Sequence, residues 1–163
     1  MKMHNPASFT IHRATVNDAY EIAVMVGELL NEIMSAMGVS FFNFSLDETT
    51  ARLEDFIGRE KYFVFVARNE NAGLIGFVSL YEGYALYAEG AFGTIPELFV
   101  SPEFRSQKAG LRLVEQAKIF GSSRGWKRLE VTTPPLPQFD KTLAFYEREE
   151  FAITGGRKLK VLL

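Results

Sequence analysis

The stretch from residue 97 to residue 114 combines residue types that suit a phosphate-bearing ligand. It begins with β-forming residues, continues through a turn and a loop of small residues, and leads into a helical pattern. A loop that opens a helix presents unpaired backbone N–H groups and the positive end of the helix dipole, which together attract anions. Arg105, Lys108 and Arg112 add three cations at spacings of three and four. The segment therefore predicts an anion site, although a solvated basic face would have the same composition.

Composition excludes several other kinds of chemistry. The chain has no cysteine, so it has no disulfide, no thiolate nucleophile and no cysteine-based zinc site. Its two histidines, His4 and His12, both lie near the N-terminus, which argues against a histidine metal site or a Ser/His triad. The net charge of -2 gives no general attraction to nucleic acid or to an anionic membrane. We therefore expect no metal, no nucleic-acid partner and no membrane partner.

The length of 163 residues, with 47% hydrophobic and 23% charged residues, predicts one globular domain spanning residues 1–163. No apolar run approaches the roughly 18 residues that a membrane-spanning helix needs. Residues 1–9 also lack the apolar stretch of a signal peptide. A cytoplasmic protein is the expectation.

The hydrophobic pattern predicts the element order β, α, α, β, β, β, α, β, α, β, β. Strands are expected at residues 9–13, 62–67, 74–81, 94–100 and 129–133, and as two short strands within 151–163. Helices are expected at residues 15–38, 45–57, 112–120 and 140–146. Hairpins together with later β-α-β units predict a mixed α/β sheet rather than a purely parallel one.

Two motifs in this framework resemble the GNAT superfamily of acyl-CoA-dependent N-acetyltransferases. That family has a strand ending in Val-x-Pro, then Glu-Tyr/Phe-Arg, then Arg/Gln-x-x-Gly-x-Gly/Ala at the start of a helix. The residues that match this first pattern are Val100, Pro102, Glu103, Phe104, Arg105 and Gly110. Residues 145–148 with Phe151 are similar to the family's Phe-Tyr-Glu-Lys-x-Gly-Phe segment, and residues 11–19 are similar to its usual opening.

The resemblance implies a GNAT-like α/β fold: a mixed, mostly antiparallel central sheet with about four helices, splayed between strands 4 and 5. It implies acetyl-CoA as acyl-donor co-substrate. By resemblance, the pantetheine amides would bind to Leu98, Phe99 and Val100, where a backbone N–H would also polarise the thioester carbonyl. The pyrophosphate would bind to Arg105, Ser106, Gln107, Lys108, Ala109 and Gly110.

Two residues are candidates for proton transfer, since acyl transfer to an amine must remove a proton from nitrogen and protonate the leaving thiolate. Tyr146 is the candidate acid, because a phenol with an ordinary pKa of about 10 keeps its proton at pH 7. Glu97 is the candidate base; its ordinary pKa of about 4.3 must rise by burial, or a water must relay the proton. A packing tyrosine and a surface glutamate are the alternatives, and the identity of the base stays open.

The sequence departs from the family pattern at four positions. Lys108 stands at the position of the central loop glycine, and Ser106 is the small residue that follows the arginine. Phe139 stands where asparagine is common, and Glu150 where glycine is usual. A Cβ at a crowded turn obstructs the approach of backbone to phosphate, whereas the lysine adds a positive charge. Whether Lys108 weakens CoA binding is open.

The acceptor implied is a primary amine of a small molecule or an amino acid, with a peptide N-terminus as a less favoured choice. Two other functions are open: a non-catalytic acyl-CoA-binding or regulatory module, and a GNAT-like fold used for protein association. The C-terminal residues 158–163 could pair with a neighbouring copy to give a homodimer. Aromatic side chains would flank the acceptor slot: Phe41, Phe42, Phe44, Tyr81, Tyr84 and Tyr87.

Overall fold

The computed structural model describes residues 8–40 and 42–163, which form two compact units, Met1–Thr132 and Thr133–Leu163. His4 and Phe41, both singled out above, lie outside the described residues. The expectation that residues 1–163 act as one domain stays a prediction.

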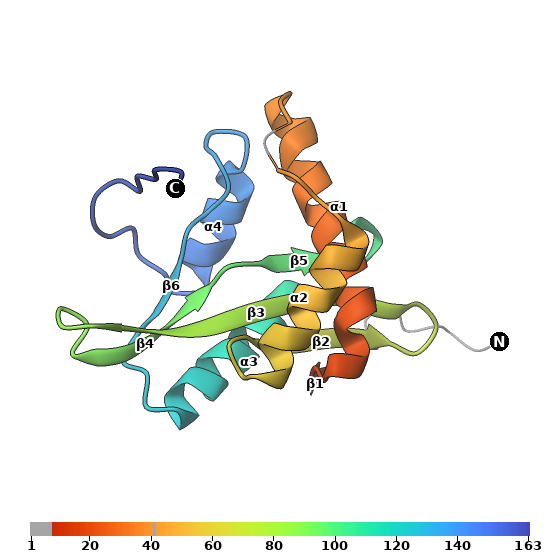
Figure 1. Ribbon diagram of the computed structural model, residues 1–163, viewed down its shortest axis with the longest axis horizontal. Helices are drawn as coiled ribbons and strands as arrows, with labels where there is room; N and C mark the ends of the chain where they lie inside the picture. The colour runs from red at the N-terminus through yellow and green to blue at the C-terminus, as the bar shows by residue number, and fades with distance from the viewer. Residues whose placement is uncertain (1–7, 41) are drawn as a thin grey trace. The chain divides into compact units, whose positions relative to one another are not determined.

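The described part of the first unit contains six strands and three α-helices (Figure 1). In chain order these are β1 (Thr10–Arg13), α1 (Ala19–Met37), α2 (Leu46–Gly58), β2 (Phe63–Asn69), β3 (Gly73–Ala85), β4 (Gly90–Ile95), β5 (Leu98–Val100), α3 (Ala109–Ser123) and β6 (Leu129–Val131). The second unit contains α4 (Asp140–Arg148). This order matches the predicted one as far as α4, but the strand expected at 94–100 is divided into β4 and β5.

The six strands form one mixed sheet in the order β1-β2-β3-β4-β6, and β5 also pairs with β3. All pairs are antiparallel except β4 with β6, which run parallel. This parallel pairing covers only residues 93–95 opposite 129–131, and the chain beyond residue 95 continues as β5 beside β3. The mixed, mostly antiparallel fold that is splayed beside its fourth strand is therefore confirmed.

The two faces of the sheet are covered by different helices. Val64 and Val66 on β2 face α1 and α2, and Ile22 and Leu53 from these helices complete the same core. In Figure 1, α1 and α2 both cross the sheet on this side. Because side chains alternate along a strand, the neighbouring residue Phe63 faces α3 instead.

The face toward α3 is built around the indole of Trp126. Phe120 on α3 lies 5.5 Å from Trp126 and 4.9 Å from Phe63, measured between ring centroids. A Cβ at Gly93 or at Gly121 would overlap with the Trp126 ring. Glycine is needed at both positions because the indole occupies the space of a side chain.

The second unit differs from the expectation at its end. The prediction of two short strands within residues 151–163 is wrong, because this segment contains no strand. Its apolar side chains from Ala152 onward are exposed; Leu159, for example, is 88% exposed. An alternating apolar pattern becomes a strand only when a neighbouring strand supplies hydrogen bonds, and the pattern itself does not guarantee that neighbour.

Candidate active site

The hydrogen bonds between β5 and β3 show which edge of β5 is used inside the sheet. The N–H of Ser79 donates to the carbonyl of Glu97 at 3.0 Å. The N–H of Ser101 donates to the carbonyl of Ile75 at 2.8 Å. Because antiparallel strands alternate between residues that bond to the partner and residues that point away, residues 97, 99 and 101 face β3.

The intervening residues Leu98 and Val100 consequently turn their backbone N–H and C=O groups to the opposite edge of β5. The carbonyl of Val100 accepts a hydrogen bond from Nε of Arg105 at 2.8 Å. The N–H of Val100 points to this outer edge, as do the N–H and the carbonyl of Leu98. At this edge the pairing of β4 with β6 has ended. Phe99 is different, since its backbone faces β3 and its side chain is buried in the core.

Glu97 lies at the interruption between β4 and β5, directly after Pro96, which has no N–H to offer a strand. It sits opposite Ser79, a buried polar residue of the central strand β3. The hydroxyl of Ser79 donates to Glu97 Oε2, and the hydroxyl of Tyr62 donates to Oε1 at 3.5 Å. Both carboxyl oxygens are thus held by side chains from other elements.

The surroundings of this carboxyl group change its pKa. Burial raises the pKa of Glu97 above its ordinary value, and the hydrogen bonds from Ser79 and Tyr62 oppose that shift. A carboxylate with a raised pKa is a stronger base near neutral pH. Burial and the nearby charge of Glu97 raise the pKa of Tyr62, so this phenol keeps its proton.

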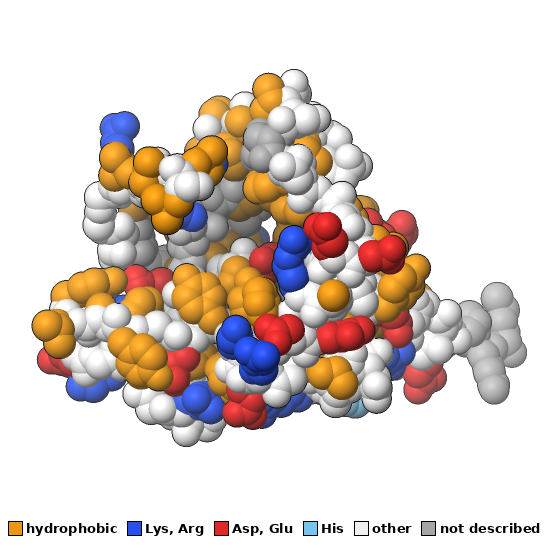
Figure 2. Space-filling view, viewed as in Figure 1, with side chains coloured by type: hydrophobic (Ala, Val, Ile, Leu, Met, Phe, Trp, Pro, Cys, Tyr) orange, Lys and Arg blue, Asp and Glu red, His pale blue; other side chains and the backbone are white. Residues whose placement is uncertain are grey.

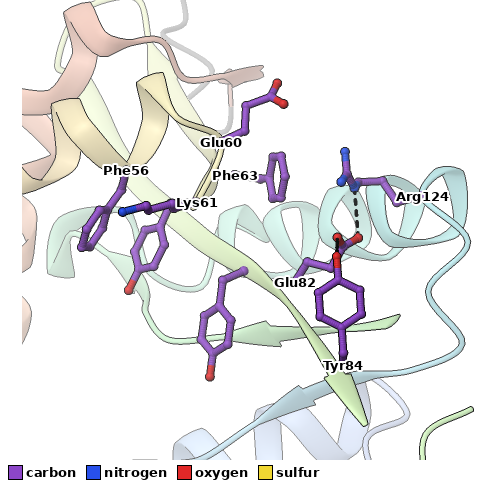
Figure 3. Close-up of a pocket in the computed structure, with 9 residues that line it drawn as sticks. Phe56, Glu60, Lys61, Phe63, Glu82, Tyr84 and Arg124 are labelled. Atoms are coloured by element: carbon purple, nitrogen blue, oxygen red, sulfur yellow. Dashed lines mark hydrogen bonds and ion pairs between the residues drawn. The ribbon is translucent and has the colours of Figure 1, made fainter. Parts of the chain in front are cut away.

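A pocket of about 470 Å³ opens beside Tyr62, where α2 ends and β2 begins (Figure 3). Much of its wall is aromatic: the Tyr62 ring lies 5.1 Å from Phe56 and 6.4 Å from Tyr81, between centroids. The residues that line the pocket are Phe56, Glu60, Lys61, Tyr62, Phe63, Tyr81, Glu82, Tyr84 and Arg124.

The polar rim of this pocket is held together by Glu82. Its carboxylate accepts hydrogen bonds from Trp126 Nε1 at 2.6 Å, from the Tyr84 hydroxyl at 2.6 Å and from Arg124 Nε at 3.4 Å. Figure 3 shows the Glu82 carboxylate between Tyr84 and Arg124. These donors, with Trp126 first, lower the pKa of Glu82.

The other pocket charges are also paired within the chain. Lys61 Nζ lies 3.7 Å from a carboxylate oxygen of Asp55, and Glu60 lies 3.6 Å from Arg13. Figure 2 shows acidic and basic side chains interspersed over the end of α2. The rim is therefore compensated in charge, and five of the nine lining residues are aromatic.

The predicted anion loop has an unusual backbone. Ser106 and Lys108 both have φ of +67°, in the left-handed region that favours glycine. Lys108 is the N-cap of α3, and its carbonyl accepts from the N–H of Arg112 at 3.0 Å. The N–H groups of Ala109, Gly110 and Leu111 belong to the first turn of α3, where an α-helix provides no i→i−4 partner for them.

Two of the three predicted cations have partners elsewhere. Arg105 forms a bidentate ion pair with Glu32 of α1, at 3.0 and 2.7 Å, in addition to its bond to Val100. Arg112 donates to the carbonyl of Phe9 at 3.1 Å and lies over that ring. Lys108 forms no ion pair within residues 8–40 and 42–163. The side chain that is available to a phosphate is accordingly that of Lys108.

Two buried side-chain oxygens in the described part of the chain have no hydrogen-bond partner, Gln107 Oε1 and Glu130 Oε2. Gln107 belongs to the anion loop. Glu130 was not predicted from the sequence: Tyr81, Thr94 and Glu130 are aligned across β3, β4 and β6, on the same face as Ser79. Only the strand register shows this, because nothing in the local sequence distinguishes Glu130 from a surface glutamate.

Tyr146 lies on α4 in the second unit. Its ring is 4% exposed and lies 5.3 Å from the Phe145 ring and 5.3 Å from the Phe151 ring. Burial raises the pKa of Tyr146. The phenol keeps its proton at neutral pH, as a general acid must, and its pairing with Glu97 in one reaction stays a prediction.

The remaining predicted aromatic residues are dispersed. Tyr81 and Tyr84 line the pocket, whereas Tyr87 is in the β3–β4 turn and 70% exposed. Phe44 packs near Gly27 of α1, and Phe42 in the α1–α2 connection is partly exposed. Of the five predicted aromatics that the structure describes, two therefore line one pocket.

Residues 8–40 and 42–163 contain neither a metal-binding cluster nor a membrane-spanning helix. No group of three or more His, Cys, Asp or Glu side chains in this part could hold a metal ion. No helix among these residues is long and apolar enough to cross a membrane.

Solved structures with the same fold include three acetyltransferases. An aminoglycoside acetyltransferase from an uncultured soil metagenomic sample is 21% identical, with a TM-score of 0.74 over 95% of this chain and 96% of that one. Ribosomal-protein-alanine N-acetyltransferase from Brucella melitensis biovar Abortus 2308 is 17% identical, with a TM-score of 0.71 over 95% and 100%. Glucosamine-6-phosphate N-acetyltransferase from Arabidopsis thaliana is 16% identical, with a TM-score of 0.72 over 94% and 98%.

At these identities the structural similarity establishes a shared fold. No curated protein sequence matches the chain. The sequence profile of the acetyltransferase (GNAT) family, however, matches residues 29–151, which include the splayed strands, the anion loop and α4. The chain therefore belongs to the GNAT acetyltransferase family and is an acyltransferase of that type.

Proposed function

We propose that this protein transfers an acetyl group directly from acetyl-CoA to the primary amine of a small molecule or amino acid. The observation that carries the proposal is the position of Glu97. This buried carboxyl group, with a raised pKa, directly precedes the strand β5, whose outer edge carries backbone N–H groups that bond to no other backbone group among residues 8–40 and 42–163. A base next to an edge that binds amides is the arrangement that acyl transfer to an amine requires.

The chain's residues fit the co-substrate. The N–H groups of Leu98 and Val100 and the carbonyl of Leu98 would bond the pantetheine amides, while Phe99 supports the strand from the core. The loop from Ser106 to Gly110 and the start of α3 would hold the pyrophosphate, with Lys108 as the cation. Acetyl-CoA, when bound, supplies the activated thioester.

Two side chains would handle protons. Glu97 would take the proton that the acceptor nitrogen must lose, because a raised pKa makes its carboxylate a stronger base. Tyr146 would hold a proton at its hydroxyl for the departing sulfur, an assignment that rests on the family motif at residues 145–148. No residue of the chain becomes covalently acetylated in this scheme.

The acceptor would arrive as a cation. Glu97 and Glu130 share one face of the sheet, and Glu130 Oε2 is buried without a donor in the described part of the chain. A carboxylate oxygen without a donor favours an ammonium or hydroxyl group as ligand. The three acetyltransferases of the same fold are named for aminoglycosides, for the alanine of a ribosomal protein and for glucosamine-6-phosphate. An amine on a polar small molecule agrees with these names.

A second candidate, a non-catalytic acyl-CoA-binding or regulatory module, is favoured by the state of the anion loop. Arg105 and Arg112 are engaged by Glu32 and Phe9, and the usual loop glycine is Lys108. Binding without turnover would follow if Glu97 and Tyr146 did not reach one substrate.

We also propose that residues 1–163 act as one domain in the cytoplasm. A homodimer is a further prediction.

Two measurements test these functions. Thermal unfolding with and without CoA tests binding, because a ligand that binds only the native state raises the melting temperature. Release of free thiol from acetyl-CoA, measured with lysine, putrescine and tyramine in turn, tests turnover. Amine-dependent thiol release supports the transferase. A melting shift without thiol release in any amine supports the binding module, and no melting shift at millimolar CoA contradicts both.

A further inference from the structure

Tyr62 is the side chain that connects the aromatic pocket with the buried carboxyl group. It lines the pocket at the end of α2 together with Phe56 and Tyr81. Its hydroxyl donates to Glu97 Oε1 at 3.5 Å. Glu97 itself is not one of the residues that line the pocket.

The carboxyl group is oriented by two different hydroxyls. Ser79 donates to Oε2 and also accepts from the backbone N–H of Glu97 at 3.1 Å, so Oε2 is held from the central strand. Oε1 receives only the longer bond from Tyr62 among the described residues. The Tyr62 side of the carboxylate is therefore its less firmly held side.

We propose that Tyr62 relays the acceptor's proton to Glu97, so that an amine bound in the aromatic pocket is deprotonated through the tyrosine rather than by the carboxylate directly. The proposal rests on the proposed function, because it takes Glu97 as the base. It adds Tyr62, a residue to which the sequence assigned no role, and it narrows the acceptor slot expected near Tyr81 and Tyr84 to this pocket.

The proton transfer balances without a further reactant. The ammonium N–H bond breaks and its proton passes to the Tyr62 oxygen, while the Tyr62 O–H bond breaks and that proton passes to Glu97 Oε1. Tyr62 ends as a neutral phenol, Glu97 as a carboxylic acid and the acceptor as a free amine. The raised pKa of Tyr62 agrees with a phenol that never persists as the phenolate.

The groups around Tyr62 are consistent with this role. Tyr81 on β3 stacks on it at 6.4 Å, with an angle of 13° between the rings. On the α2 side, Lys61 lies over the Phe56 ring and close to Asp55, so its charge is compensated there. Within the described residues, the charged group in hydrogen-bond contact with the Tyr62 hydroxyl is Glu97.

The test compares Tyr62→Phe, Ser79→Ala, Glu97→Gln and the double variant Y62F/E97Q, with acetyl-CoA and whichever of lysine, putrescine and tyramine the wild type uses fastest. The pH profile of kcat/KM for the amine is measured for each. Both Tyr62→Phe and Ser79→Ala remove a hydrogen bond that lowers the pKa of Glu97, so both should move the acidic limb of the profile upward. Only Tyr62→Phe removes the relay.

We expect Tyr62→Phe to lower the plateau value of kcat/KM by about 10- to 100-fold, at the lower end of general acid–base effects, with acetyl-CoA affinity retained. The plateau value of kcat/KM should fall several-fold less in Ser79→Ala than in Tyr62→Phe. The double variant should be no slower than Glu97→Gln, because residues that act as a unit are not additive. Melting temperatures confirm that each variant is folded.

If Tyr62→Phe and Ser79→Ala lowered the plateau value of kcat/KM equally, Tyr62 would only adjust the pKa of Glu97. That result would overturn the relay. A double variant whose loss is the product of the two single losses would overturn it too. Wild-type protein without turnover of any amine would overturn the proposed function and the relay together. Turnover by the wild type with an unimpaired Tyr62→Phe variant would overturn the relay alone.

Discussion

Lys108 occupies a backbone conformation that glycine tolerates better, so replacing it should change stability in a predictable direction. Its φ and ψ are +67° and +13°. A non-glycine residue in this region costs roughly 1–2 kcal/mol. Glycine avoids that cost but loses about 0.5–1 kcal/mol more backbone entropy on folding than alanine does. We therefore expect Lys108→Gly to have a free energy of unfolding about 0.5–1 kcal/mol above that of Lys108→Ala.

The comparison of glycine with alanine isolates the backbone, because both variants lose the lysine side chain. For a chain of 163 residues, this difference corresponds to about 1–4 °C in melting temperature. Glu115 is the control, since it is exposed within α3 where the backbone is helical. There the order should reverse, with Glu115→Gly less stable than Glu115→Ala by about 0.5–1 kcal/mol.

The same variants test the role of Lys108 toward the cofactor by calorimetry with CoA. Lys108→Ala should weaken binding by about 1–3 kcal/mol if the lysine makes a charged hydrogen bond to phosphate. Lys108→Gly should lose less, because it restores the loop backbone to which a phosphate can approach. A Lys108→Gly variant less stable than Lys108→Ala would refute the strain argument, and equal CoA affinity in all three proteins would make Lys108 a bystander.

Three further predictions follow from other parts of the structure. Tyr146→Phe should keep CoA affinity and lower kcat by about 10²- to 10⁴-fold in a reaction limited by chemistry; an unchanged kcat there would remove the acid assignment. Because the pKa of Glu97 is raised in the folded protein, its contribution to stability is present below the unfolded-state pKa and is lost as pH rises through the folded-state pKa. The melting temperature of Glu97→Gln should therefore rise relative to that of the wild type as pH increases above the unfolded-state pKa of about 4.3, and a difference that does not change with pH would contradict this. Gly93→Ala should destabilise the protein by about 1–3 kcal/mol in denaturant unfolding, because its Cβ overlaps with Trp126, and Gly156→Ala, in open space, is the control that should change little.

Local sequence was sufficient for most of the elements. The helical segment expected from residue 15 begins with a capping box, in which the Asp18 carboxylate accepts from the N–H of Thr15 at 2.9 Å. The β2–β3 hairpin also formed as its apolar runs and turn predict. These features depend on interactions between residues close together in the chain, which is why a pattern of residue types is enough to predict them.

Partners distant in the sequence were not predicted. The ion pair between the Arg105 guanidinium and Glu32, which lies 73 positions away, was not expected, and phosphate binding by Arg105 stays a prediction. The strands expected within residues 151–163 did not form, since a strand requires a neighbouring edge and not only alternating residues. The partner of the Arg105 guanidinium and the missing strands both depend on which surface a side chain or a backbone segment contacts, and composition and periodicity do not determine that surface.

The sequence by itself determined that Glu97 is followed by β-forming residues, a loop and a helix that resemble an acyl-CoA site, because those segments are contiguous in the chain. Only the tertiary structure decided what surrounds Glu97. Ser79 and Tyr62 lie 18 and 35 positions away, and the register of β3 against β5 together with the end of α2 brings their hydroxyls to one carboxyl group. Burial and hydrogen bonding at that point, rather than the identity of the residue, set the pKa that makes Glu97 a candidate base.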